Sequence, residues 1–243
     1  MFNAKQTKNQ IIDWIKGYFA ANATPETKAV IGISGGKDST ISAALLVEAL
    51  GKERVLGALM PQGEQSDIDV SNAVCRFLSI ESVIVNIGEP TKQIYGEILS
   101  AGIKLNDVAT FNTPARVRMA TLYAIAGAVG GRVVNNCNLS ESYVGYSTKF
   151  GDGAGDFGLL RNLTVTEVKA IGYELGLPAE FIEKVPVDGL QPKTDEDNLG
   201  FTYAVLDRYI REGICDDAET LSRIKAMHAI SRHKVETMPA FSF

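Results

Sequence analysis

A short stretch near the N-terminus combines residue types that bind phosphate. Residues 32–39 lie between an apolar run and an apolar helical pattern, and they read Gly32-Ile33-Ser34-Gly35-Gly36-Lys37-Asp38-Ser39. A turn from a strand into a helix gathers backbone N–H groups and the positive end of a helix dipole, and glycine lets the backbone approach an oxyanion closely. The two serines add hydroxyl donors, the lysine adds a positive charge, and the aspartate adds a carboxylate suited to Mg²⁺. The spacing matches neither a Walker A loop nor a GxGxxG dinucleotide loop. A plain strand-to-helix turn also favours glycine, but it leaves these four polar side chains unexplained.

The stretch from Ser34 to Ser39 resembles the pyrophosphate-binding loop of the ATP pyrophosphatases. In that superfamily the loop holds the pyrophosphate end of ATP while a nucleophile attacks the α-phosphate. Enzymes that thiolate tRNA, asparagine synthetases and NAD synthetases all carry versions of it. The loop alone therefore leaves the second substrate open.

The elements that must position this loop follow from the alternation of apolar runs and helical patterns. Strands are expected over residues 29–33, 54–60, 82–87 and 132–136, and helices over residues 7–21, 89–100, 115–129, 164–175, 203–211 and 217–233. Thr164 and Glu167 have the spacing of a capping box. Strands that alternate with helices predict an α/β fold, a doubly wound parallel sheet flanked by helices, in a single domain over residues 1–243.

The segments between these elements carry weaker patterns. A loop is expected over residues 103–112, a long glycine-rich functional loop over residues 143–158, and a polar segment over residues 186–198. Pro114 is expected in the first turn of a helix. Arg116 and Arg118 would then lie near a helix N-terminus, where cations are unfavourable, so they indicate an anionic partner.

Later motifs resemble one family more narrowly. Residues 116–119 (RVRM), 138–141 (NLSE), 145–152 (GYSTKFGD) and 193–203 (KTDEDNLGFTY) are similar in type and order to ammonia-dependent NAD synthetase, as are residues 233–234 and 238–239. The resemblance covers the chain from about residue 29 to the C-terminus. It implies an adenine-nucleotide alpha-hydrolase-like, Rossmann-like fold. It also implies that Mg-ATP adenylates the nicotinate carboxylate of deamido-NAD, that pyrophosphate leaves, and that ammonia then displaces AMP to give NAD.

The resemblance assigns roles to individual residues. Asp38 and Glu141 match metal positions for Mg²⁺, and residues 32–39 match ATP-binding positions. The positions expected to bind deamido-NAD are Arg116, Tyr146, Lys149, Asp156, His233 and Lys234, with Tyr146 stacked on the nicotinate ring. Asp152 is the candidate for binding ammonium and helping to remove its proton, so the expected catalytic residues are Lys37, Asp38, Glu141 and Asp152. Taken singly, each acidic residue is more readily explained as a cap or a surface charge, and only the shared order of the motifs favours catalysis.

Three further ATP-binding positions depart from the family pattern. Asn136 stands where threonine is frequent, Val165 where lysine is frequent, and Val187 where serine or threonine is frequent. Lys37 is a candidate to supply the charge absent at Val165.

The composition limits the class of protein. Hydrophobic residues make up 45% and charged residues 22%, and the net charge is −5, whereas nucleic-acid binding requires clustered Lys and Arg. Cys75, Cys137 and Cys215 are far apart and lack CxxC spacing, which favours a reducing cytoplasm over disulfides or a zinc site. Since no apolar run reaches the roughly 18 residues of a membrane span, the sequence predicts a cytoplasmic protein without nucleic-acid or membrane partners.

The nitrogen source and the assembly are expectations of the same kind. The chain offers no room for a fused glutaminase domain, and no histidine lies near Cys137 in the sequence to activate it. Cys137 is therefore expected to pack at a strand end, and free ammonia or a separate ammonia-supplying partner is expected as the nitrogen source. The resemblance implies a homodimer with deamido-NAD near the interface. Two alternatives remain open: another adenylating ATP pyrophosphatase, such as a tRNA-modifying enzyme, and a nucleotide-binding homologue without turnover.

Overall fold

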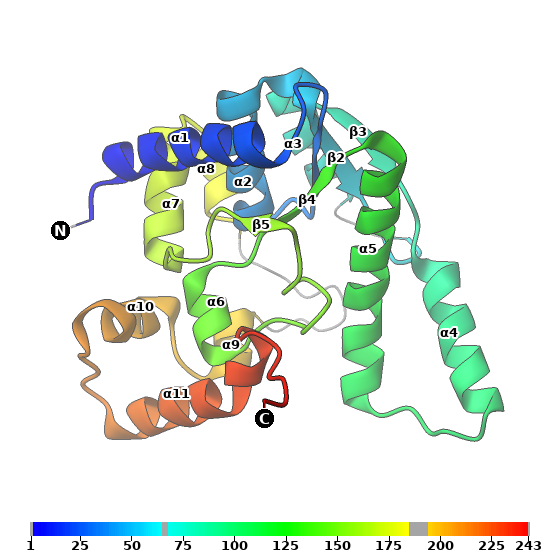
Figure 1. The fold of residues 1–243 in the computed structure, drawn as a ribbon. Helices are drawn as coiled ribbons and strands as arrows, with labels where there is room; N and C mark the ends of the chain where they lie inside the picture. The colour runs from blue at the N-terminus through cyan, green and yellow to red at the C-terminus, as the bar shows by residue number, and fades with distance from the viewer. Residues whose placement is uncertain (1, 65–67, 185–193, 243) are drawn as a thin grey trace.

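Five parallel strands form one sheet in the computed structural model, in the order β3-β2-β1-β4-β5 (Figure 1). The structure describes residues 2–64, 68–184 and 194–242. The strands are β1 (Ala29–Gly32), β2 (Val55–Leu59), β3 (Glu81–Ile84), β4 (Arg132–Asn135) and β5 (Phe157–Gly158). The chain runs outward from β1 to β3 and then returns to β4 on the other side of β1. This reversal places a topological switch point between the carboxyl ends of β1 and β4, where open parallel sheets bind ligands.

Helices surround the sheet and extend beyond its carboxyl edge (Figure 1). Those up to the switch point are α1 (Ala4–Asn22), α2 (Lys37–Leu50), α3 (Ile68–Leu78), α4 (Gly88–Ser100) and α5 (Asp107–Val129). Those that follow are α6 (Leu139–Val144), α7 (Val165–Glu174), α8 (Ala179–Ile182), α9 (Asp195–Leu199), α10 (Tyr203–Glu212) and α11 (Ala218–Ser231). Short 3₁₀ turns lie at Lys52–Arg54 and Arg232–Lys234. No helix within the described residues is long and apolar enough to cross a membrane.

The two faces of the sheet are covered by different helices because side chains alternate along a strand. In β1, Ala29 and Ile31 face the larger core with α1, α2, α3, α7 and α8, whereas Val30 faces a smaller core with α5. A third apolar cluster holds α6, α9, α10 and α11 together, with Val165 at the start of α7 contributing to it. The doubly wound parallel α/β fold predicted from the sequence is confirmed, as is the Thr164–Glu167 capping box that opens α7.

The loop predicted over residues 103–112 holds for residues 103–106 and was wrong for the rest, because α5 already begins at Asp107. Its N-cap Asn106 accepts a hydrogen bond from the Ala109 amide at 2.9 Å. Val108 and Phe111 are exposed in this first part of the helix, so no buried face produced a periodic pattern.

Pro114 was predicted to lie in the first turn of a helix, and this was wrong, because it lies inside α5. A proline leaves the carbonyl four residues earlier without its helical donor. Here that carbonyl belongs to Thr110, and the Tyr95 hydroxyl of α4 donates to it at 2.7 Å. Arg116 and Arg118 therefore stand in the middle of a helix, and the dipole argument made for them does not apply.

The expected loop over residues 143–158 is also shorter than predicted. Its start belongs to α6, and Phe157–Gly158 pairs with β4 as a fifth strand. Two residues among glycines are too few for a strand pattern to be visible in the sequence. Within the polar segment over residues 186–198, the described part forms the start of α9.

The packing of α7 is expected to contribute strongly to the stability of the larger core. Ile171 of α7 is fully buried in that cluster. Ile171→Ala is expected to lower the free energy of unfolding by about 2–5 kcal/mol through lost burial and a residual cavity. Ile230→Ala in α11 is the matched control, since Ile230 is 78% exposed, and it should change the urea midpoint little. Equal losses in the two variants would contradict this assignment of the core.

Candidate active site

The glycine-rich loop after β1 forms a cradle at the switch point. Gly36 caps α2 without any side-chain hydrogen bond, so the amides of its first turn are available to an anion. The Ser34 and Ser39 hydroxyls lie 3.2 Å apart, and Ser34 Oγ accepts a hydrogen bond from the Gly36 amide at 3.2 Å. Gly35 has φ +76°, and a Cβ there would lie 3.1 Å from the Ser71 backbone nitrogen. Both its conformation and its close packing therefore require glycine.

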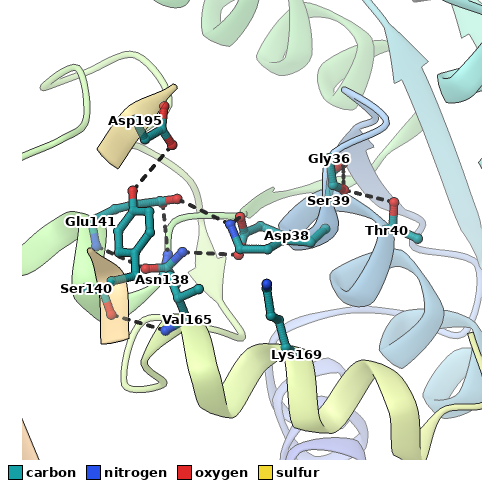
Figure 2. Close-up of polar contacts among 12 residues, drawn as sticks. Gly36, Asp38, Ser39, Thr40, Asn138, Ser140, Glu141, Val165, Lys169 and Asp195 are labelled. Carbon is teal, nitrogen blue, oxygen red and sulfur yellow. Dashed lines mark hydrogen bonds and ion pairs between the residues drawn. The ribbon is translucent and has the colours of Figure 1, made fainter. Parts of the chain in front are cut away.

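A buried cluster of charges lies beside this cradle (Figure 2). The Lys37 ammonium is 2.8 Å from Asp38 Oδ2 and 4.0 Å from Glu141 Oε1, and the Lys37 side chain is only 4% exposed. Burial acts to lower the pKa of Lys37, but the carboxylates of Asp38 and Glu141 outweigh it and raise that pKa above its ordinary value. Desolvation, together with the Asp38 charge, raises the pKa of Glu141 to about 8 against the opposing effect of Lys37. With both carboxylates ionised, these three side chains carry a surplus negative charge.

This cluster has the chemistry of a partial magnesium site. Asp38 and Glu141 offer hard oxygen ligands, brought near each other around a single cation. Among the described residues, no group of three or more His, Cys, Asp or Glu side chains is arranged to hold a metal alone. Mg²⁺ is commonly held by one or two carboxylates together with substrate phosphates and water, so this pair fits the ion in the presence of a nucleotide.

Asn138 connects the two carboxylates from the end of β4. Its Nδ2 donates to Asp38 Oδ1 at 3.1 Å, and its Oδ1 accepts from the Glu141 amide at 3.0 Å. Glu141 Oε2 in turn accepts from the Asn138 amide at 3.4 Å, which completes a capping box on α6. Asn138 belongs to the motif over residues 138–141 but was given no role of its own, although the Asn-x-x-Glu spacing of a capping box was visible.

Asp207 of α10 supports the site through contacts with α6 and the start of α7, and it was not predicted from the sequence. Its carboxylate accepts from the Ser140 hydroxyl at 2.5 Å, from the Thr166 amide at 2.8 Å and from the Thr166 hydroxyl at 2.6 Å. The Ser140 hydroxyl oxygen also accepts from the Val165 amide at 3.1 Å. Asp207 thus ties α6 to the N-terminus of α7, and nothing in the local sequence distinguishes it from a surface acid of an amphipathic helix.

Most of the residues expected to bind the second substrate lie on the loop after α6 or contact it from α5 and from the turn after α11. Arg116 Nε donates to the Lys149 carbonyl at 3.2 Å, and Lys149 Nζ donates to the His233 carbonyl at 2.6 Å. Lys234 Nζ donates to the carbonyls of Gly145 and Ser147 at 2.7 and 2.9 Å. Asn198 Nδ2 donates to the Tyr146 hydroxyl at 3.3 Å. A cleft of about 270 Å³ lies here, and its lining includes Tyr123, Lys149, Phe150, Arg161 and Lys234.

The two aspartates of this region occupy different surroundings. Asp152 Oδ1 accepts from the Thr148 amide at 2.9 Å, and its Oδ2 lies 3.8 Å from the Cys137 sulfur. Asp156 Oδ2 accepts from the Val133 amide at 2.7 Å, and its Oδ1 accepts from the Tyr123 hydroxyl at 3.1 Å. Both carboxylate oxygens of Asp156 therefore already have protein donors.

Cys137 is buried at the end of β4, as expected. Burial, with the added effect of the Asp152 carboxylate, raises the pKa of Cys137 well above its ordinary value. This raised pKa keeps the group a thiol. Since the thiolate is the reactive form of cysteine, Cys137 is not a nucleophile here.

The three positions that depart from the family pattern are placed differently. Asn136 Nδ2 donates to the Gly32 carbonyl at 3.0 Å, while its Oδ1 is buried without a partner among the described residues. Val165 is 5% exposed and packs in the third apolar cluster. Val187 lies outside the described residues.

Comparison with known proteins identifies relatives of the chain. The family model for NAD synthase matches residues 7–241. The NH(3)-dependent NAD(+) synthetase of Pyrococcus furiosus is 39% identical over 210 residues, covering 86% of this chain and 78% of that protein. Its counterpart in Archaeoglobus fulgidus is 36% identical over 98% of this chain and 96% of its own length. Among solved structures, the NMN synthetase of Francisella tularensis matches with a TM-score of 0.91 and 31% identity, over 100% of both chains.

Asn138 is expected to matter for ATP through its bond to Asp38 and not only as a helix cap. Asn138→Ala should lower the free energy of unfolding by about 0.5–2 kcal/mol, the usual cost of an N-cap, and should lower kcat/KM for ATP at least about tenfold. Asn106→Ala is the matched control, because Asn106 caps α5 by the same kind of bond away from the charge cluster. Comparable activity losses in the two variants, measured beside their urea unfolding curves, would show that the Asp38 contact is unimportant.

Proposed function

Because the chain belongs to the NAD synthase family, we propose that it makes NAD from deamido-NAD, ATP and ammonia, with AMP and pyrophosphate as the other products. The observation that carries this proposal is the charge cluster of Asp38, Glu141 and Lys37. It lies beside the N-terminus of α2, which no side chain caps. It combines anion-binding amides with two carboxylates at the switch point of a parallel sheet. A site of this kind suits the triphosphate of ATP.

In the first step, an oxygen of the nicotinate carboxylate bonds to the α-phosphorus of ATP, and the bond to the pyrophosphate oxygen breaks. The leaving pyrophosphate carries away the electron pair, so negative charge accumulates at the N-terminus of α2, where the amides of the first helical turn are available as donors. Donors fixed in advance of the reaction stabilise such charge without reorganisation. Asp38 and Glu141 would hold Mg²⁺, which supplies charge neutralisation at the phosphates when bound.

In the second step, the nitrogen of ammonia bonds to the activated carbonyl carbon, and the bond from that carbon to AMP breaks. The nitrogen must also lose a proton before the amide is neutral. Asp152 is the proposed acceptor, because the Thr148 amide fixes its Oδ1 while its Oδ2 accepts a long, weak hydrogen bond of 3.8 Å from the Cys137 thiol, which an incoming ammonium can replace. Tyr146, Lys149 and Arg116 are the proposed contacts for the deamido-NAD substrate.

Location and assembly belong to the same proposal. The three cysteines are free thiols, which supports a reducing cytoplasm. A homodimer is proposed from the family resemblance, and the exposed apolar side chains of Val108 and Phe111 on α5 support a partner surface there.

A second acceptor is favoured by one observation. The NMN synthetase of Francisella tularensis matches with a TM-score of 0.91, above the 0.79 of the NAD+ synthetase from Burkholderia pseudomallei. The corresponding reaction would amidate nicotinate mononucleotide, which lacks the adenylyl half of deamido-NAD but carries the same carboxylate. The proposed adenylation chemistry is the same for both acceptors.

Product analysis of the purified protein tests the function and the acceptor together. With Mg-ATP, ammonium and deamido-NAD, we expect NAD, AMP and pyrophosphate in equal amounts, and removal of Mg²⁺ by a chelator should stop all three. If nicotinate mononucleotide gives a kcat/KM at least about tenfold higher, the second acceptor is the physiological one. Absence of turnover with either acceptor would refute the proposal.

Asp38→Asn provides the residue-level test of the same reaction. It should lower kcat by about 10²–10³, the usual cost of losing one transition-state contact. Asp69→Asn is the control, since Asp69 also lies in the first turn of a helix but is exposed on α3. Full activity in Asp38→Asn would remove Asp38 from the mechanism.

A further inference from the structure

The positive charge available to the phosphates of ATP is smaller than the loop sequence suggests. The Lys37 ammonium is already bound by Asp38 at 2.8 Å and faces Glu141 at 4.0 Å. Val165, at the position where the family resemblance leads one to expect a lysine, packs among apolar side chains. A triphosphate bound at the loop therefore needs a cation from elsewhere in the site.

Lys169 of α7 lies where such a cation is needed. It follows Val165 by four residues, and residues spaced in this way share one face of a helix. Figure 2 shows its side chain extending from α7 toward Asp38 at the edge of the loop. The Lys169 side chain is 35% exposed, so its ammonium can reach a ligand that enters from solvent.

The present partner of Lys169 is easily exchanged. Lys169 Nζ lies 2.6 Å from Glu183 Oε2, and the Glu183 side chain is 47% exposed. The Tyr173 hydroxyl donates to the other carboxylate oxygen at 3.0 Å, so Glu183 keeps a donor when Lys169 leaves. Exposed ion pairs contribute little to stability, and a phosphate group is a stronger partner for an ammonium.

Glu183 also lies within the electrostatic reach of the loop. Hydrogen bonds from Lys169 and then Tyr173 are the main causes that lower the pKa of Glu183, and the Lys37 charge contributes to the same shift. The Glu183 carboxylate is therefore stabilised mainly by Lys169 and Tyr173, and the Lys37 charge makes a smaller contribution.

We propose that Lys169 binds the phosphates of ATP beyond the α-phosphate, in place of the lysine absent at Val165, and that Glu183 holds its ammonium when ATP is not bound. This inference rests on the proposed function for the identity of the nucleotide. ATP and Glu183 then compete for one ammonium, and release of pyrophosphate returns Lys169 to Glu183. Lys37 retains a separate task, the neutralisation of Asp38 and Glu141.

Calorimetric binding of ATP and of AMP to three variants tests the proposal. Lys169→Met should weaken ATP binding at least about tenfold and leave AMP binding within about twofold, since AMP lacks the contacted phosphates. Lys169→Arg should restore part of the ATP affinity. Glu183→Gln should strengthen ATP binding, because it removes the competing carboxylate. In steady-state kinetics, Lys169→Met should raise KM for ATP and leave KM for the nicotinate acceptor unchanged.

Lys92→Met is the matched control, since Lys92 also lies on a helix and pairs with an acid, Glu89, at 2.8 Å. It should alter neither nucleotide affinity. If Lys169 serves only to join α7 to α8, Lys169→Met and Glu183→Gln will lower the melting temperature alike and leave ATP affinity unchanged, which would overturn the inference. Failure of the unaltered protein to bind ATP would overturn the proposed function as well, so the two failures are distinguishable.

Discussion

The buried ammonium of Lys37, held between the carboxylates of Asp38 and Glu141, is the contact on which the site depends. It joins the loop after β1 to the helix after β4, and so connects the two sides of the switch point. Two carboxylates this close in a buried position would repel each other without a cation. The lysine offsets part of that repulsion, although the pKa of Glu141 is still raised to about 8, and the same contacts reduce the availability of the lysine to phosphate.

Polar contacts from distant parts of the chain fix this cluster in place. The Asn138 side chain holds the Asp38 carboxylate and caps α6, and the Asn138 backbone amide holds the Glu141 carboxylate. Asp207 anchors α6 and the start of α7 from α10. Each contact satisfies a buried donor or acceptor that would otherwise destabilise the fold. The third apolar cluster brings these helices to the carboxyl edge of the sheet, so the packing beyond the sheet determines the geometry of the chemistry.

The cations on the acceptor side bind the protein's own backbone. Lys149 and Lys234 donate to carbonyl oxygens that join the loop after α6 to the end of α11, and Arg116 donates to the Lys149 carbonyl. Gly145 permits the close approach, because a Cβ there would lie 2.1 Å from that of Ser231. The C-terminal helices thus shape the loop that is proposed to receive the nicotinate substrate.

The sequence by itself determined the features that depend on neighbouring residues. The Ser-Gly-Gly-Lys-Asp-Ser turn, the alternation of strands and helices and the Thr164 capping box all follow from short-range steric and hydrogen-bonding preferences, and the order of the motifs identified the family. Only the tertiary structure decided which partners the charged groups take. Tyr95 satisfies the carbonyl that lets α5 continue through Pro114, Asp207 supports α6 and α7, and Lys169 faces the loop while Val165 is buried. These partners lie far apart in the chain or on different helices, and a pattern of local preferences contains no information about which of them packing will bring together.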